Sequence, residues 1–97
     1  MPATVHVIAR FLAKAGKEDE LKAVLTALVP ASRREIPCYQ YDLLSNPSDP
    51  REFCFVERWE NDAALDQHLA APHVVTALAQ AEPLLEGQPD VRRYRIL

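Results

Sequence analysis

Residues 57–73 decide the fold, and they read Glu57-Arg-Trp-Glu-Asn-Asp-Ala-Ala-Leu-Asp-Gln-His-Leu-Ala-Ala-Pro-His73. The stretch begins as a strand, turns sharply at Glu60-Asn61 and continues as a helix that stops at Pro72. Asn61 is a favourable N-cap residue, and Asp62 interacts well with the positive end of a helix dipole. The stretch therefore predicts a strand followed directly by a capped helix.

One face of that helix carries an imidazole. Leu65, His68 and Leu69 stand at positions i, i+3 and i+4, so they lie on the same side of the helix. We expect this apolar side to face the protein interior. Because the preceding strand ends with Glu57 and Trp59, we expect the imidazole to lie near these two side chains.

The rest of the chain continues the alternation of strands and helices. Apolar residues with a period of two predict strands over 4–11, 38–44, 52–59 and 91–97. Helical spacing predicts helices over 17–35, with a bend at Pro30, and over 73–85. The order β–α–β–β–α–(α)–β is the split pattern of ferredoxin-like folds. We therefore predict an α+β class with one antiparallel sheet, helices on one face, and a hairpin loop over 45–50.

The patterns also assign side chains to the core. The residues predicted to share its faces are Val5, Val7, Ala9 and Phe11; Tyr39, Tyr41 and Leu43; Phe53, Phe55, Glu57 and Trp59; and Val74, Val75, Leu78 and Leu85. The opposite sheet face carries apolar residues as well, Ile8 among them. That second face therefore needs a cover of its own.

The length of 97 residues fits one domain over 1–97. A chain of this size buries only roughly 60–65% of its unfolded surface, so it gains from a partner that covers an apolar face. A second copy of the sheet would provide that cover. We expect a homodimer in which two sheets pack face to face.

Composition narrows the choice of partners. The net charge is −3, and Arg92, Arg93 and Arg95 form the only dense basic group, on a predicted strand where a solvated or interface role is expected. Nucleic acid is therefore not an expected partner. No apolar run approaches the roughly 20 residues that span a bilayer, and no secretory signal is recognisable. We expect a cytoplasmic protein that does not bind membranes.

Recognisable cofactor motifs are missing from the sequence. Cys38 and Cys54 lack metal-ligand spacing, and they are out of register in the predicted hairpin, so we expect buried, reduced thiols. The sequence has no Gly-rich phosphate loop, nucleophile elbow or metal-ligand cluster. Neither flavin, nicotinamide nor metal is therefore expected.

The sequence resembles the antibiotic-biosynthesis monooxygenase family over nearly its whole length. The resemblance is strongest over 53–74, where Phe-x-Phe-x-Glu-x-Trp is followed by Ala-Leu-x-x-His-Leu-x-x-Pro-His, and Gly16 and Tyr41 also fit. It implies a small dimeric α+β barrel. The family includes cofactor-free quinol oxygenases, haem-degrading enzymes, isomerases and many members of unknown activity.

The resemblance also indicates which branch of this family the chain is more similar to. The haem-degrading branch carries an Asn, a Trp and a His, and this chain places Ala9, His68 and Leu78 at those positions. Haem chemistry is therefore not expected. The cofactor-free branch oxidises electron-rich phenols or quinols with dioxygen, and the substrate carbanion supplies the electron.

Five residues are candidates for that chemistry. A neutral His68 in a pocket can take the proton of a phenolic hydroxyl, whose pKa is near 10. Glu57 can orient the imidazole or keep it basic. Trp59 and Tyr41 can stack on a planar substrate or bond to it, and Arg10 can pair with the substrate anion or with Glu57.

Each candidate also has a purely structural interpretation. His68 can be a satisfied core histidine, Glu57 can pair with a neighbouring arginine, and Trp59 and Tyr41 can serve packing alone. We predict a cofactor-independent monooxygenase that acts on a small aromatic, phenolic or quinol-type compound. Two alternatives stay open: a non-catalytic, stress-associated dimer that binds a small ligand, and an isomerase that acts on a small hydroxylated or phosphorylated carbonyl compound.

Overall fold

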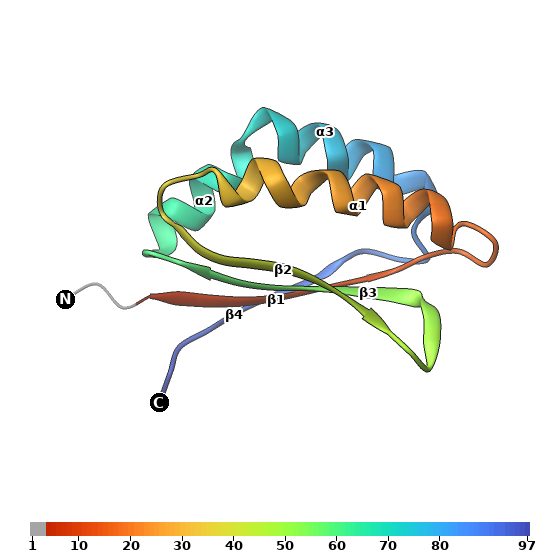
Figure 1. Ribbon diagram of the computed structural model, residues 1–97, viewed down its shortest axis with the longest axis horizontal. Helices are drawn as coiled ribbons and strands as arrows, with labels where there is room; N and C mark the ends of the chain where they lie inside the picture. The colour runs from red at the N-terminus through yellow and green to blue at the C-terminus, as the bar shows by residue number, and fades with distance from the viewer. Residues whose placement is uncertain (1–3) are drawn as a thin grey trace.

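The computed structural model describes residues 4–97. Its elements follow in the order β1 (Val5–Leu12), α1 (Glu18–Arg33), β2 (Cys38–Asn46), β3 (Asp49–Trp59), α2 (Asp62–Ala70), α3 (Pro72–Ala81), the short 3-10 helix η1 (Glu82–Leu84) and β4 (Asp90–Tyr94). The strands form one antiparallel sheet in the order β2-β3-β1-β4, and the helices lie on one side of it (Figure 1). The predicted α+β, ferredoxin-like fold is confirmed.

The core lies between the sheet and the helices. Leu21, Leu25 and Leu28 recur along one side of α1 and are buried against the sheet. Every second side chain of β1, and of most of β3, is buried and contributes the sheet side of this core. Pro30 lies inside α1 without ending it, but the helix ends at Arg33, before the predicted position 35. Residues 34–37 therefore form a turn.

On α3 one predicted core residue was wrong. The buried side of this helix carries Val74, Ala77 and Ala81, whereas Val75 is 54% exposed. Adjacent helical residues point about 100° apart, so Val74 and Val75 cannot both face the sheet squarely. The small alanines let α3 pack closely, and Val75 is left on the outside.

Strand β2 contains a bulge that the sequence pattern did not reveal. Cys38 pairs with Trp59, and Tyr41 pairs with Glu57, so β2 uses one residue more than β3 over this length. The additional residue is Tyr39, which is 47% exposed, whereas Tyr41 is 3% exposed. The bulge therefore overturns the prediction that both tyrosines share the core face.

The hairpin between β2 and β3 is tighter than predicted. Only Pro47 and Ser48 separate the two strands, because the Asn46 Oδ1 atom accepts a hydrogen bond of 2.9 Å from the Ser48 amide and closes the turn. Strand β4 is shorter than predicted, since its pairing with β1 ends at Tyr94.

The far side of the sheet is open in the single chain. Its large apolar side chains include Ile8, Leu44 and Tyr94, which are 44%, 48% and 43% exposed. Cys54 lies on this side, half-buried, and both Cys54 and Cys38 are free thiols. Within residues 4–97, no helix is long and apolar enough to cross a bilayer.

Candidate active site

A small hollow lies between the sheet and the helices. It has a volume of about 70 Å³. Its walls are mostly apolar, with Tyr41, Glu57 and His68 as the polar members, and the rest are Val7, Ala9, Phe11, Leu28, Phe55, Leu65, Leu69, Val74, Leu78, Pro89 and Val91. A buried water needs roughly 10–15 Å³ of such space, so the hollow has room for several water molecules.

The polar wall of the hollow comes from two neighbouring strands. Glu57 on β3 is paired with Tyr41 on β2, and both side chains point to the helices. Strand alternation also directs Trp59 to this side, two residues further along β3. The two strands therefore place three of the candidate side chains next to α2.

His68 reaches these residues from α2 and is 2% exposed. Its ring lies over Trp59, with 4.3 Å between the ring centroids, and meets Tyr41 edge-on at 5.4 Å. The helix that carries it is fixed at its start, because the Asn61 Oδ1 atom accepts a hydrogen bond of 2.8 Å from the Ala64 amide. The predicted N-cap is confirmed.

The two nitrogens of the imidazole have different surroundings. Nδ1 lies 2.7 Å from the Oε2 atom of Glu35, in the turn after α1. An ionised carboxylate can only accept, so Nδ1 carries the proton and Nε2 keeps its lone pair. Nε2 has no hydrogen-bond partner among the described residues. Burial lowers the pKa of the His68 imidazole, although the Glu35 carboxylate opposes this, so the neutral ring is favoured.

Glu57 does not take the role that the sequence suggested for it. Its Oε1 atom accepts a hydrogen bond of 2.9 Å from the Trp59 indole, and Glu35 is the carboxylate that orients the imidazole. Burial, opposed by the indole bond and supported by the charge of Glu35, raises the pKa of Glu57 to about 7. Burial likewise raises the pKa of the Tyr41 phenol, which stays protonated at neutral pH.

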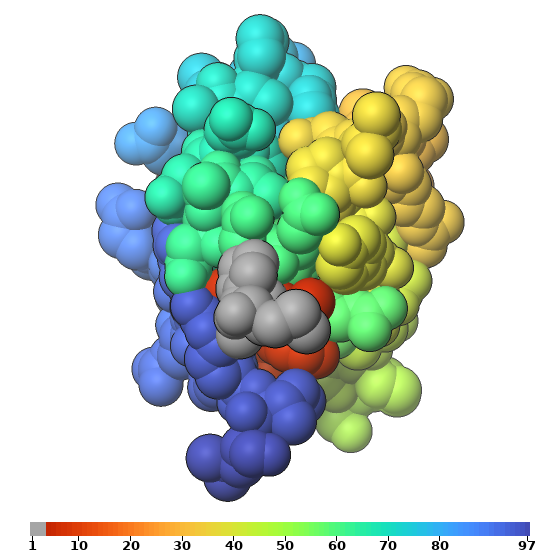
Figure 2. Space-filling model, turned by 90° about the vertical axis from the view of Figure 1, so that its left-hand side faces the viewer, coloured from red at the N-terminus to blue at the C-terminus, as the bar shows by residue number. Residues whose placement is uncertain are grey.

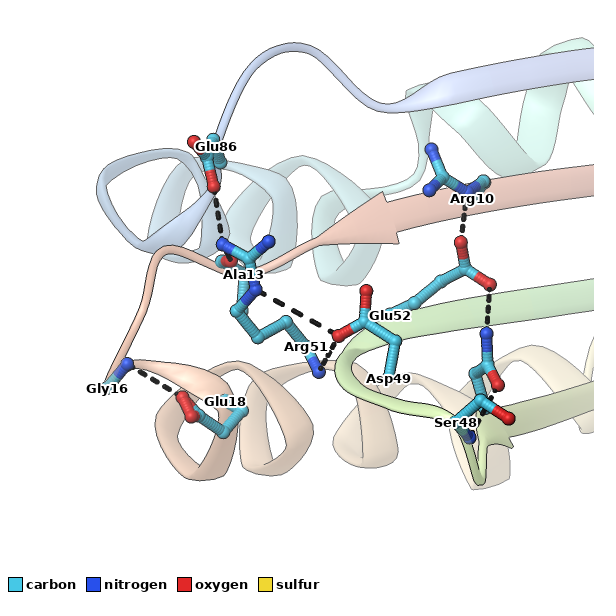
Figure 3. A network of polar contacts seen from close by, with 10 residues as sticks. Arg10, Ala13, Gly16, Glu18, Ser48, Asp49, Arg51, Glu52 and Glu86 are labelled. Carbon is cyan, nitrogen blue, oxygen red and sulfur yellow. Dashed lines mark hydrogen bonds and ion pairs between the residues drawn. The ribbon is translucent and has the colours of Figure 1, made fainter.

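Arg10 lies apart from the other predicted site residues. Ala9 and Phe11 line the hollow, so strand alternation turns Arg10 to the open side of the sheet. There it forms an ion pair with Glu52 rather than with Glu57 (Figure 3). The fold therefore gathers His68, Glu57, Tyr41 and Trp59, and it leaves Arg10 out.

A further group of polar atoms lies behind His68. The Nε2 atom of His73, in the first turn of α3, is 3.4 Å from the Oε2 atom of Glu35. One donor atom from each of Glu35, His68 and His73 lies within 4.8 Å of the others. The prediction that the chain has no metal-ligand cluster missed this group, because Glu35 is remote in sequence from both histidines.

Known proteins resemble this chain in sequence. The profile of the family described as antibiotic biosynthesis monooxygenase matches residues 4–80. The protein "Putative monooxygenase Rv0793" of Mycobacterium tuberculosis is 36% identical over 88% of this chain and 83% of its own length. A Bacillus subtilis protein with the same kind of name, YcnE, is 31% identical over 86% of this chain and 87% of its own length.

Solved structures resemble the chain in fold. The crystal structure of PA3566 from Pseudomonas aeruginosa matches with a TM-score of 0.93 and 33% identity, over 100% of this chain and 97% of the other. The structure of Rv0793 matches with a TM-score of 0.92 and 33% identity, over 98% and 96%. Both matches therefore cover nearly all the elements that surround the hollow in this chain.

Proposed function

Because the chain belongs to the antibiotic biosynthesis monooxygenase family, we propose that it oxidises a small aromatic, phenolic or quinol-type compound with dioxygen and needs no cofactor. The names of its relatives support the general monooxygenase role. The observation that carries the proposal is the His68 ring, which Glu35 holds at Nδ1, which keeps its lone pair at Nε2, and which lines an apolar hollow.

The first step is removal of a proton. Nε2 of His68 accepts the proton of the substrate hydroxyl, and the Nδ1–H group donates to the Glu35 carboxylate, which stabilises the imidazolium. The substrate anion forms beside this cation. The hollow is largely apolar, and its low effective dielectric constant strengthens the attraction between the two charges. Trp59 holds the imidazole plane in place.

The second step uses the electrons of the substrate. The anion gives an electron to dioxygen, the two radicals combine at a ring carbon, and the peroxide loses water to leave a carbonyl. One oxygen atom enters the product, the other leaves as water with two substrate hydrogens, and no external reductant is needed. Glu57, with a pKa of about 7, can donate or accept the proton that the peroxide step requires.

The size of the hollow favours a small substrate and a reaction without an organic cofactor. At about 70 Å³ it would have to open much further for a flavin or a haem than for a single-ring substrate. A single aromatic ring requires rim residues to move, and of these Leu69 and Val91 are exposed and Leu78 is half-buried. Tyr41 then offers a hydroxyl that can bond a substrate oxygen.

The test is oxygen uptake with a panel of single-ring quinols and polyphenols. The wild-type protein should consume oxygen after exhaustive chelation, and His68→Ala should lose that activity while it keeps its circular dichroism. His6→Gln, a histidine on the open sheet side, is the matched control and should keep the activity.

Other results would point elsewhere. Normal turnover by His68→Ala would remove His68 from the mechanism. Saturable binding without oxygen uptake would support the ligand-binding alternative, and proton exchange in a carbonyl substrate without oxygen uptake would support an isomerase.

A further inference from the structure

Three metal-ligating side chains meet at one end of the molecule, next to the hollow but outside it. Glu35 lies in the turn after α1, His68 in the last turn of α2, and His73 in the first turn of α3. Figure 2 views this end, where the segment that follows α1 (yellow) lies beside α2 (green). We propose that these three residues bind one divalent transition-metal ion, for example Zn²⁺.

The spacing of the donor atoms suits such an ion. Zinc bonds of about 2.0–2.2 Å place neighbouring tetrahedral donors roughly 3.3 Å apart. The Glu35 Oε2 atom is 3.4 Å from His73 Nε2 and 2.7 Å from His68 Nδ1. Coordination therefore needs the second pair to open by about half an ångström, and it needs the imidazole nitrogens of His68 and His73, which lie within 4.8 Å of each other, to reach the same spacing. Two imidazoles and a carboxylate favour zinc and its neighbours over Mg²⁺ or Ca²⁺, which prefer oxygen ligands.

The state of His73 points independently to a ligand. Its Nε2 atom is buried, yet it makes no hydrogen bond to the described residues. Buried polar atoms without a partner are rare and call for a water or an ion. This nitrogen lies 3.4 Å from the Glu35 carboxylate, in the first turn of α3, so it is directed towards the other two side chains of the group.

An ion can reach this position from solvent. The side chains of His73 and Glu35 are 32% and 23% exposed, whereas that of His68 is 2% exposed. Three protein ligands leave a fourth position for water or a small anion. Neither Glu35 nor His73 lines the hollow, so the ion would lie behind His68 and would not touch a substrate there.

The ion would block the proposed base, and this second part of the inference rests on the proposed function. Coordination occupies the lone pair at Nδ1, so the proton at Nδ1 leaves and the neutral ring carries its one proton at Nε2. An Nε2–H group cannot accept the substrate proton. Bound metal and general-base action by His68 therefore exclude each other.

Metal binding can be tested without any substrate. Chelated, metal-free protein is titrated with Co²⁺, and the visible absorption of a tetrahedral site and the heat of binding are recorded. We expect one ion per chain, at least roughly tenfold weaker binding in His73→Ala, since loss of even an outer-sphere partner costs 10–100-fold, and unchanged binding in His6→Ala. No tetrahedral band, or equal affinity in His73→Ala, would overturn the site.

A second measurement separates the inhibition from the proposed function. Oxygen uptake should fall as Zn²⁺ fills the site, return on addition of chelator, and resist Zn²⁺ in His73→Ala. Zinc binding that leaves oxygen uptake unchanged would overturn the inhibition. A cobalt band with no oxygen uptake under any condition would leave the site standing and remove the proposed function.

Discussion

At the scale of single residues, Glu57 is the most unusual group of the chain. It is a carboxyl that is 5% exposed, with an indole N–H as its hydrogen-bond donor and no cation bonded to it among residues 4–97. Burial raises its pKa to about 7 from an ordinary value of 4.5. Its negative form is therefore costly to the fold, and that cost depends on pH.

The pH dependence gives a prediction with a definite sign. The folded state binds the Glu57 proton more tightly than the unfolded state, so this group's contribution to stability is complete below pH 4.5 and is lost as pH rises through 7. Glu57→Gln keeps an oxygen acceptor for Trp59 and has no proton to lose. Its stability relative to wild type should rise by about 2–3 kcal/mol between pH 5 and pH 8.5.

Urea unfolding at the two pH values measures this change. Glu60→Gln is the control, because Glu60 is an exposed glutamate that directly follows β3 and the substitution removes the same kind of carboxyl group from the surface. A flat difference between Glu57→Gln and wild type over this range would mean that Glu57 is not a perturbed acid.

Single residues also show how far sequence alone could reach. Glu57 and Trp59 were placed correctly because β3 alternates without interruption. Arg10 was misjudged as a site residue, although the same alternation assigns it to the face opposite Ala9 and Phe11. Glu35 was missed because its contact with His68 spans 33 residues, and no local pattern marks a polar residue in a turn as a partner of a remote histidine.

At the scale of elements, α2 is short and depends on its ends. It has nine residues, so its position owes much to the Asn61 cap and to the ion pairs of Asp62 and Asp66 with Arg93 on β4. The same helix positions His68. Loss of the cap should therefore affect both stability and the site.

Asn61→Ala should lower the free energy of unfolding by about 1 kcal/mol, because the Ala64 amide loses its acceptor. Asn61→Asp keeps a capping oxygen and should stay close to wild type. Chemical denaturation of the wild type and the two variants measures these differences in the free energy of unfolding. Equal destabilisation of both variants would show that the amide group of Asn61, and not capping, is what matters.

Sequence patterns predicted the elements well where each has one regular face. They failed at the β2 bulge, since Tyr39 and Tyr41 are two residues apart and period-two alternation gives no sign that Tyr39 is an extra, unpaired residue. They also placed Val75 inside, because two adjacent valines satisfy an apolar pattern equally well. Packing against the sheet decided between them.

At the scale of the whole molecule, the chain has one covered and one uncovered sheet face. We propose that a second copy covers the open face, since Ile8, Leu44 and Tyr94 are large apolar side chains that the single chain leaves exposed. Ile8 lies on β1, which β3 and β4 flank on its two sides. A charge at this position should therefore disturb the contact.

Wild-type protein should sediment as a dimer, and Ile8→Glu should shift it to the monomer. Val75→Glu introduces the same charge at an exposed apolar residue on the helix side and should remain dimeric. A monomeric wild-type protein, or equal dissociation of the two variants, would argue against packing through the open face.

The narrow hollow has a consequence for selectivity. A chamber that admits a few waters at rest acts as a sieve, because each added ring of a ligand must push further side chains from their places. Fused polycyclic compounds should thus be rejected on bulk alone, while compact monocyclic ones pass. The rim at Pro89 and Val91 would set this threshold, so trimming Val91 to alanine is the change that should broaden the range of accepted molecules.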